Sequence, residues 1–284
     1  MSAFSLYDIA PTLPPIQVLD VGALDDPGVP AVYAGLVAAG HARVVGFEPD
    51  LQGCIKLNQK FGAPHQFYPL FAGAGGPAKF HQTSLTDAGS LYPPNTPLLE
   101  LFNDLGELLS VVQVHDVDTK RIDDIPGIDD VDFIKLDVQG AELDVLKGAE
   151  KALGQAVVIQ SEVEFIELYQ GQPLFADVDT HLRAHGFMFH NLVALLSRTV
   201  KPIRTGAADH GLNQRLSADV IYFKHPLQLS ALSTDKLRKT AAVMHDLYLS
   251  YDWAYFFLTA ADARDGQSLA QSYLARLTTL GSPA

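Results

Sequence analysis

Short apolar runs alternate with helix-length segments along most of the 284-residue chain. The runs predicted to be strands are 16–20, 43–48, 66–72, 133–138, 157–163, 187–192 and 219–223. Strands that alternate with helical segments are typical of βαβ units, in which helices cover a mostly parallel sheet. The pattern therefore predicts an α/β fold.

Two segments depart from this pattern. Between Phe71 and Asp132 the stretches AKFHQTS and LLSVVQVHDVD predict short strands, with the Gly/Pro-rich loop GSLYPPNTP between them and no convincing helix, so we expect an insertion over one edge of the site. After Phe223 apolar residues recur at three- and four-residue spacing, which predicts two or three helices packed on the domain. The expected organisation is a lead-in at 1–15, a domain at 16–226 and a helical extension at 227–284.

The composition limits the partners and the location that can be expected for the protein. An apolar fraction of 48% supports an ordinary globular core, and a formal net charge of −13 argues against nucleic acid as a partner, because binding a phosphate backbone depends on Lys and Arg. The N-terminus lacks a basic segment followed by an apolar one, and no apolar stretch is long enough to span a membrane, so we expect a cytoplasmic protein with no membrane partner. The one cysteine, Cys54, excludes an internal disulfide and is expected to be a half-buried apolar residue on a helix.

Acidic residues stand at the ends of three predicted strands. Asp20 ends the run IQVLD, with Gly22 in the turn that follows; Glu48 ends ARVVGFE, and Asp137 ends VDFIKLD. In an open parallel sheet the carboxyl ends of the strands meet ligands in one crevice, so we expect Asp137 near Asp20 and expect Glu48 to accept hydrogen bonds from both hydroxyls of a ribose. The dinucleotide fingerprint G-x-G-x-x-G is missing, because the residues ALDD follow Gly22. That acidic turn disfavours a pyrophosphate and favours a ligand with positive charge.

The segment GAELDVLKGAEKAL after Asp137 is predicted to be one helix. Its apolar residues Leu143, Leu146 and Ala149 are expected to face inward. Glu142 is interpreted as structural, since a negative charge in the first turn suits the helix dipole.

The block DFIKLDVQGAELDVLKGA, residues 132–149, resembles the hallmark of the FkbM family of S-adenosylmethionine-dependent methyltransferases. The resemblance extends to VLDVGA, VVGFEPD, SEVEF with LYQGQPLF, HLRAHGF and ADVIYFK, so it covers residues 16–224 and leaves the helical extension outside. It implies a Rossmann-like class I methyltransferase sheet of seven strands, the last one antiparallel, that binds S-adenosylmethionine at the strand tips.

The resemblance also implies roles for single residues. Carried over one by one, the positions expected to bind the cofactor are Asp20, Gly22, Ala23, Glu48, Pro49, Ser90, Leu91 and Asp137. The first three would line the amino-acid end of the cofactor, and the next two would hold its ribose. Ser90 and Leu91 look like a loop that closes over the cofactor, and Asp137 would lie beside the methyl-donor end. The turn ALDDPG departs from the family's pattern, in which a second small or amide residue is usual.

Methyl transfer to a hydroxyl needs an aligned acceptor and a group that removes the proton. Asp137 and Glu162 are the preferred candidate bases. Of the alternating pair Glu162 and Glu164 we expect only one to face the site, with Glu164 solvated or paired. His115 is expected to be an ordinary exposed strand histidine.

The leading hypothesis is an O-methyltransferase that acts on a hydroxyl of a small molecule such as a sugar or a secondary metabolite. A nicotinamide-dependent oxidoreductase or epimerase would share the ribose-binding acid, but the pyrophosphate glycines and a Tyr-x-x-x-Lys pair are missing. A third alternative is a non-catalytic module that binds a cofactor or a partner on the same fold.

An aromatic cluster and a pair of histidines each have a structural and a functional interpretation. The aromatic residues between Tyr248 and Phe257 could form a homodimer face or a lid, although plain core is favoured. No metal is expected, because the helical pair His181 and His185 would lie away from the strand tips, where a solvated polar face is the better interpretation.

Overall fold

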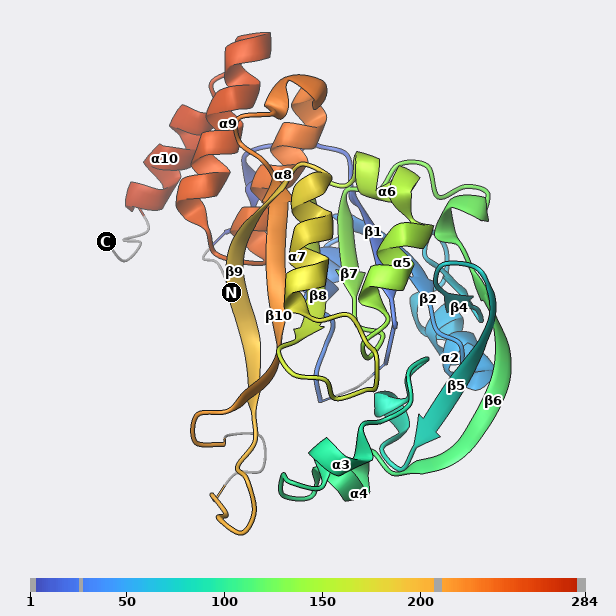
Figure 1. Cartoon of the computed structure of the whole chain (residues 1–284). Helices are drawn as coiled ribbons and strands as arrows, with labels where there is room; N and C mark the ends of the chain where they lie inside the picture. Colours follow the sequence, from blue (N-terminus) through green and yellow to red (C-terminus); the bar gives the residue numbers. More distant parts are fainter. Residues whose placement is uncertain (1–3, 26–27, 207–210, 280–284) are drawn as a thin grey trace.

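A seven-stranded sheet forms the centre of the computed structural model, which describes residues 4–25, 28–206 and 211–279 (Figure 1). In sheet order the strands are β3 (Gln66–Tyr68), β2 (Ala42–Phe47), β1 (Ile16–Val21), β7 (Phe133–Leu136), β8 (Val158–Glu164), β10 (Arg215–Lys224) and β9 (Phe187–Ser197). Neighbours from β3 to β8 are parallel, whereas β10, the last strand in chain order, is antiparallel to β8 and β9. The predicted α/β fold with seven strands and an antiparallel last strand is confirmed.

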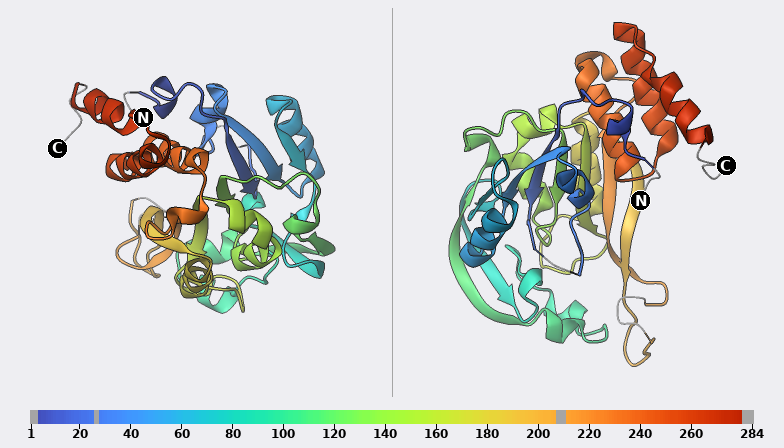
Figure 2. Two further views of the ribbon diagram at one scale, coloured as in Figure 1. Left: turned by 90° about the horizontal axis from the view of Figure 1, so that it is seen from above. Right: turned by 180° about the vertical axis from the view of Figure 1, so that it is seen from behind.

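Helices cover both faces of this sheet, because successive residues of a strand point to opposite sides. Val18 and Phe133 belong to one apolar core, while the next residues along the chain, Leu19 and Ile134, belong to the other. The first core is closed by α1 (Ala34–Ala38), α2 (Leu51–Phe61), α8 (Thr234–Asp246), α9 (Tyr251–Asp265) and α10 (Leu269–Thr279). The second core is closed by α5 (Glu142–Gly148), α6 (Glu150–Gln155) and α7 (Phe175–Ala184). The sheet is therefore the middle of three layers, as the view from above in Figure 2 shows.

The C-terminal helices pack directly against the sheet. The side chains of α8 from Leu237 to His245 are all buried. Asp132, which is fully buried just before β7, accepts hydrogen bonds from Lys236 Nζ at 2.6 Å and from Lys239 Nζ at 2.7 Å. The predicted helical extension is thus three helices in the described residues, and α8 is tied to the sheet by buried charge as well as by apolar contact.

The aromatic residues of the extension divide between core and surface. Phe257 is fully buried, and the Trp253 ring lies 4.7 Å from the Phe223 ring of β10 between centroids. Tyr255 and Phe256 remain 38% and 40% exposed. The preference for core is therefore correct for part of this cluster.

The segment between β3 and β7 forms a second sheet and two single-turn helices. Its strands are β4 (Phe71–Ala72), β5 (Gly76–Thr83) and β6 (Val111–Lys120), and α3 (Thr96–Leu99) and α4 (Leu105–Leu108) lie between β5 and β6. The expectation of no helix here is wrong, because a single turn is too short to show a helical period. Phe102 bridges to Val200, which places α3 and α4 beside the connection between β9 and β10 (Figure 1).

The single strand predicted over 66–72 is wrong, since the structure divides it into β3 and β4. Pro69 has no N–H to donate to a ladder, and the chain turns there, with the Leu70 amide donating to the Tyr68 carbonyl at 3.0 Å. The two halves therefore join different sheets.

The single helix predicted after Asp137 is also divided, at Ala149, into α5 and α6. A β-carbon added to Gly148 would lie 2.0 Å from the Gly73 carbonyl oxygen, so the end of α5 lies against the turn that precedes β5. Ala149 then leaves helical geometry, with a ψ of 34°. The inward positions predicted for Leu143, Leu146 and Ala149 are confirmed, because all three lie in the second core.

The remaining short elements are the 3-10 helices η1 (Leu6–Asp8), η2 (Thr86–Ala88), η3 (Ile122–Asp124) and η4 (Leu229–Ala231). Cys54 on α2 is 2% exposed, so it is fully buried in the first core rather than half-buried as expected. Within the described ranges, no helix has the length and apolarity needed to cross a membrane.

Candidate active site

Four adjacent parallel strands carry acidic side chains at or near their carboxyl ends. Asp20 is the penultimate residue of β1, Glu48 follows β2, Asp137 follows β7, and Glu162 lies near the end of β8. Since the sheet order runs β2-β1-β7-β8, these acids share one edge of the sheet. Lys135 Nζ lies 3.7 Å from Asp20 Oδ1 and 3.3 Å from Asp137 Oδ2, so the predicted proximity of the two aspartates is confirmed.

The Asp20 carboxylate is buried beneath that edge, with the residue only 2% exposed. The Tyr33 hydroxyl donates to Oδ2 at 2.5 Å, while Oδ1 faces Lys135 without a hydrogen bond from the described residues. Burial raises the pKa of Asp20, and Lys135 and Tyr33 oppose that shift. In this structure Asp20 therefore holds Lys135 and Tyr33 in place. Tyr33 was missed by the sequence reasoning, because it comes from the loop before α1.

Gly22 allows two turns at this edge to touch. Its φ is +83°, and a β-carbon there would lie 1.9 Å from the Asp137 carbonyl oxygen. The amides of Gly22 and Ala23 both donate to the Phe47 carbonyl, at 3.1 and 2.9 Å. The glycine is thus needed for contact between the β1 and β7 turns, and Ala23, 1% exposed, lies under the same surface.

Glu48 is half-buried at the tip of β2, in the position predicted for a ribose-binding acid. Its Oε1 accepts from the Asp50 amide at 2.7 Å, and no other described group donates to its carboxylate. Burial raises the pKa of Glu48 to about 7, and the charges of Asp50 and Asp20 act in the same direction. Pro49 follows Glu48 and precedes Asp50, the N-cap of α2, which begins at Leu51.

Asp137 and Glu162 meet through a third side chain, Gln139, which the sequence reasoning did not select. Gln139 Nε2 donates to Asp137 Oδ1 at 3.1 Å and to Glu162 Oε2 at 2.8 Å. Burial opposes the charged form of Asp137, but Lys135, Gln139 and Glu162 outweigh it and lower the pKa of Asp137. Burial, and then the charge of Asp137, raise the pKa of Glu162 well above its usual range. The two shifts run in opposite directions, so of the pair Asp137 gives up its proton more readily than Glu162.

Glu162 and Glu164 lie two residues apart in β8, so their side chains are on the same face of the strand. Burial raises the pKa of both; the charge of Asp137 comes next for Glu162, and the charges of Glu142 and then Asp137 come next for Glu164. That only one of them faces the site stays a prediction. Glu164 is 2% exposed and accepts from Gln172 Nε2 at 2.8 Å, so it is paired and not solvated.

Glu142 is confirmed as a structural acid by its contacts. Its Oε1 accepts from the Val138 amide at 2.8 Å and from the Gly140 amide at 3.3 Å, which closes the turn between β7 and α5. Burial raises the pKa of Glu142 to about 7.

The loop predicted to close over a cofactor touches the site from the insertion. Ser90 is 1% exposed, and its Oγ donates to the Gln139 carbonyl at 2.6 Å and accepts from the Tyr92 amide at 3.0 Å. Leu91 is half-buried beside it. The Ser90 hydroxyl is thus engaged in holding the β7–α5 turn, and Leu91 and Tyr92 are the more accessible residues of the loop.

The histidines considered earlier lie elsewhere. His115 is on β6 in the small sheet, with Nε2 3.1 Å from Gln82 Oε1. His181 on α7 and His185, the residue that caps its C-terminus, have tilted rings with centroids 4.3 Å apart. Among residues 4–25, 28–206 and 211–279, no three His, Cys, Asp or Glu side chains gather in a way that could hold a metal ion.

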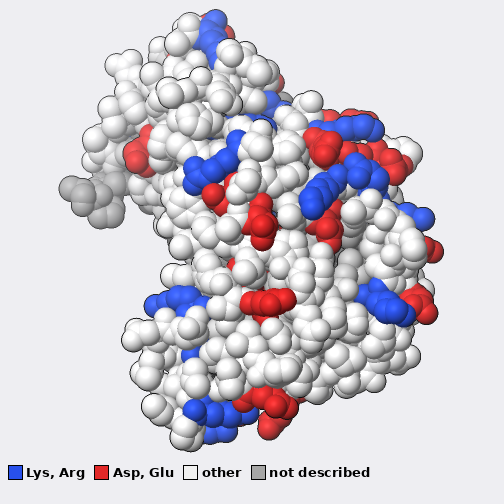
Figure 3. Space-filling view, viewed as in Figure 1, with Lys and Arg blue, Asp and Glu red and all other residues white. Residues whose placement is uncertain are grey.

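The charge at the strand ends is strongly unbalanced. The acids that act on one another there are Asp20, Glu48, Asp137, Glu142, Glu162, Glu164 and Asp219. Within the described part of the chain, Lys135 is the one cation that forms ion pairs with them. Elsewhere on the face seen in Figure 3, acidic and basic side chains are interspersed. Such a surplus of acid suits a ligand that brings positive charge.

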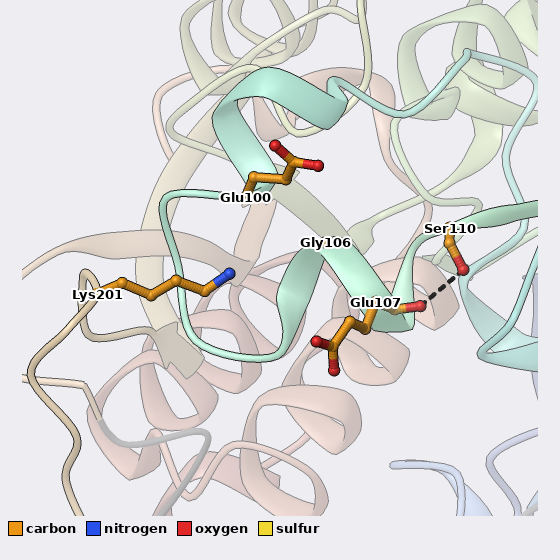
Figure 4. A pocket seen from close by; sticks show the side chains of 5 residues that line it. All are labelled: Glu100, Gly106, Glu107, Ser110 and Lys201. Atoms are coloured by element: carbon orange, nitrogen blue, oxygen red, sulfur yellow. Dashed lines mark hydrogen bonds between the residues drawn. The ribbon is translucent and has the colours of Figure 1, made fainter.

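Two surface hollows lie apart from these acids. One, of about 430 Å³, is lined by Glu100, Gly106, Glu107, Ser110 and Lys201, where the insertion meets the β9–β10 connection (Figure 4). The other, of about 500 Å³, lies at the opposite end of the strands beside Lys224 and Lys236. Neither contains a strand-end acid, so the chemistry at the strand tips, and not the volume of a hollow, locates the candidate site.

Comparisons with known proteins find one family that covers more than half of the chain. The model of the methyltransferase FkbM domain matches residues 20–189. The chain is 29% identical over 152 residues to the 2-O-methyltransferase NoeI of Sinorhizobium fredii (strain NBRC 101917 / NGR234). That match covers 49% of this chain and 60% of NoeI, so the chain spans less than two thirds of the curated relative's length.

Two solved structures resemble the chain loosely. Precorrin-6y C5,15-methyltransferase from Geobacter metallireducens GS-15 gives a TM-score of 0.36 at 13% identity, over 77% of this chain and 87% of that one. The 23S rRNA methyltransferase ErmE gives 0.34 at 11% identity, over 90% and 96%. Scores this low support no argument about this chain, whose fold rests on its own sheet order and strand directions.

Proposed function

The chain belongs to the FkbM methyltransferase family, and we propose that it is an S-adenosylmethionine-dependent O-methyltransferase acting on a hydroxyl of a small molecule such as a sugar or a secondary metabolite. The observation that carries this proposal is the acidic surplus around Lys135 at the ends of β2, β1, β7 and β8. The name of the relative NoeI, a 2-O-methyltransferase, supports oxygen as the acceptor atom.

The residues at the strand ends suit S-adenosylmethionine. When bound, it supplies a methyl group on a positively charged sulfur, next to an amino-acid end with an ammonium group. Glu48, with an oxygen to which no described group donates, would accept the ribose hydroxyls. The amino-acid and sulfonium end of the cofactor would lie among the turn of Gly22 and Ala23, the partly exposed Asp137, and Ser90 with Leu91.

The protein must also orient the acceptor hydroxyl and take its proton. The Asp137 side chain is 40% exposed, and Lys135 and Gln139 favour its charged form, whereas burial and the charge of Asp137 favour the neutral form of Glu162. The charged Asp137 would take the proton of the acceptor hydroxyl and become neutral. Acids this close titrate as a pair, so the pair, and not either residue alone, is the proposed base.

The acceptor would reach the site from the side of the insertion. Ser90 and Tyr169 connect the insertion and the loop after β8 to Gln139, and α3 with α4 borders the β9–β10 connection. Loops of this kind carry specificity while the sheet carries the common chemistry. A homodimer through the extension and a cytoplasmic location stay predictions.

The first experiment is calorimetric titration of S-adenosylmethionine, S-adenosylhomocysteine and NAD into wild type, Glu48→Gln and the matched control Glu150→Gln, which changes an exposed glutamate on α6. We expect the sulfur cofactors to bind wild type and the control equally, and Glu48→Gln to bind at least about 10-fold more weakly, since a neutral amide replaces the acceptor of two hydroxyls.

Each alternative function has its own outcome. A clear NAD signal without binding of the sulfur cofactors would contradict the proposal and favour the oxidoreductase. Cofactor binding without transfer of radioactive methyl to any of a panel of hydroxylated acceptors would favour the non-catalytic module.

A further inference from the structure

The Gln139 side chain donates hydrogen bonds to two of the strand-end acids. Its Nε2 lies 3.1 Å from Asp137 Oδ1 and 2.8 Å from Glu162 Oε2. A primary amide carries two N–H groups, so it can donate to both carboxyls at once. The two carboxyls come from different strands, and this amide connects them.

Tyr169 contacts the oxygen of the same amide. Its hydroxyl lies 2.9 Å from Gln139 Oε1 and 3.0 Å from the Ala88 carbonyl, and the residue is 1% exposed. If the amide were reversed, its oxygen would face the Asp137 carboxylate, which in its charged form can only accept a hydrogen bond. The Asp137 carboxylate therefore favours the orientation in which Gln139 donates to it, and Tyr169 can donate its one proton to Gln139 Oε1 or to the Ala88 carbonyl.

The backbone at Gln139 is held in an unfavourable conformation. Its φ is +55°, in the left-handed region that Gly and Asn adopt more easily than Gln. Ser90 Oγ donates to the Gln139 carbonyl at 2.6 Å and supports this geometry from the insertion. A residue kept in such a conformation, with its side chain between two acids in a candidate site, indicates a functional constraint.

We propose that Gln139 is a positioning residue that holds Asp137 and Glu162 together as one proton-accepting pair, an inference that rests on the proposed transfer of a methyl group to a hydroxyl. The groups that face this pair are Lys135 on β7, Glu164 on β8, Asp219 on β10, Glu142 on α5 and Tyr169 in the loop after β8. Three of these five groups are acids, and the Tyr169 hydroxyl contacts Gln139 and Ala88 and not a carboxyl. Lys135 donates to Asp137, but it brings a positive charge. Gln139 thus supplies a neutral donor to both carboxyls without adding charge.

The test compares wild type with Gln139→Asn, Tyr169→Phe and the matched control Gln113→Asn, which shortens an exposed glutamine on β6. Asparagine tolerates the positive φ and keeps the amide, but it lacks the methylene needed to reach both acids. A positioned base contributes about 10²- to 10⁴-fold to a rate, so kcat of Gln139→Asn should fall about 10- to 100-fold. Its dissociation constant for S-adenosylmethionine should stay within about twofold of wild type, because the amide is proposed to act on the base and not on the cofactor.

The pH profile separates positioning from simple structural damage. Loss of the donor disfavours the carboxylate form, so the acidic limb of the kcat profile should move to higher pH in Gln139→Asn. The shift should be smaller in Tyr169→Phe, where the amide stays but its oxygen loses the hydroxyl contact. The control should match wild type. An unchanged kcat and acidic limb in Gln139→Asn, in a wild type that is active, would overturn the inference. So would a weaker cofactor affinity with kcat unchanged.

A readout without turnover keeps this inference separate from the proposed function. Carbon-13 NMR titration of the Asp137 and Glu162 carboxyls should show linked transitions in wild type and a higher pKa of Asp137 in Gln139→Asn. Absence of methyl transfer in wild type would remove the proposed function, whereas titration curves that are the same in both proteins would remove the role of Gln139.

Discussion

Replacing Lys135 by methionine tests the charge balance at the strand ends most directly. The Lys135 side chain is 16% exposed, and its ammonium lies between Asp20 and Asp137. Methionine retains most of the apolar stem but removes the charge. Asp20, whose side chain is 3% exposed, then keeps the Tyr33 hydroxyl as its one described donor.

The size of the effect follows from burial. Removing one partner of a buried ion pair costs about 3–5 kcal/mol, because the other charge is left without compensation. The Asp137 side chain is 40% exposed, so solvent screens its share, and we expect a loss of about 2–4 kcal/mol in the free energy of unfolding near pH 8.

The sign of the pH dependence is fixed by the same contacts. In wild type Lys135 helps to hold the pKa of Asp137 low, so that aspartate contributes stability above its unfolded pKa of about 3.9 and loses it as the pH falls through the folded value. In Lys135→Met the pKa values of Asp20 and Asp137 both rise. An acid whose pKa is raised by folding contributes stability at low pH, and this contribution is lost as the pH increases. The free energy of unfolding of the variant should therefore fall further below that of wild type between about pH 5 and pH 8.

Urea unfolding followed by circular dichroism at several pH values measures this deficit, with Lys120→Met, an exposed lysine of β6, as the control. The control should lie within about 0.5 kcal/mol of wild type. A deficit that is independent of pH, or smaller than about 1 kcal/mol near pH 8, would refute the argument that Lys135 balances a buried acidic group.

Three further predictions concern other parts of the same framework. Since the pKa of Glu48 is raised to about 7, affinity for S-adenosylmethionine should weaken as the pH falls through that value, and calorimetry should find Glu48→Gln insensitive to pH in this range. Gly22→Ala should lose at least about 3 kcal/mol of stability, because its β-carbon would lie 1.9 Å from a carbonyl oxygen. The control Gly40→Ala, with a similar φ of +76° and open space around it, should lose about 1 kcal/mol. Equal losses in thermal unfolding would contradict the clash. Asp132→Asn should lose about 3–5 kcal/mol in urea unfolding, because two lysines of α8 lose a fully buried partner, and a loss below about 1 kcal/mol would show that α8 is held by apolar contacts alone.

The large sheet could be predicted because its strands are buried on both faces and read as compact apolar runs. The predicted strand at 66–72 and the predicted helix after Asp137 were wrong because the chain turns within each of them. Pro69 lies between residues that are all compatible with a strand, and α5 ends where Gly148 meets the Gly73 carbonyl, a contact between segments far apart in the chain. Neither the turn at Pro69 nor the contact of Gly148 can be inferred from the spacing of apolar residues along the sequence.

The strand-end acids could be predicted for a similar reason, since the end of an apolar run is visible in the sequence. Tyr33, Gln139 and Tyr169 could not, because each lies in a loop whose path is set by tertiary contacts. Lys135 was visible as a lysine inside a buried strand, which is unusual enough to indicate a buried partner. Gln139 had a weaker signal, as a polar residue between a strand-end acid and a glycine.

The acidic group also explains why residue identity alone does not assign roles here. Asp137 and Glu162 are both carboxylic acids at neighbouring strand ends, yet Asp137 lies beside Lys135, which helps to lower its pKa, while Glu162 lies among other acids, which raise its pKa. Without Lys135 and the Gln139 amide, two carboxyls this close would compete for a proton in either direction. The asymmetry that a proton-accepting site needs therefore comes from one lysine and one amide placed on opposite sides of Asp137. A ligand with positive charge near Asp137 would reinforce this asymmetry, because it favours the charged form of the acid that it approaches.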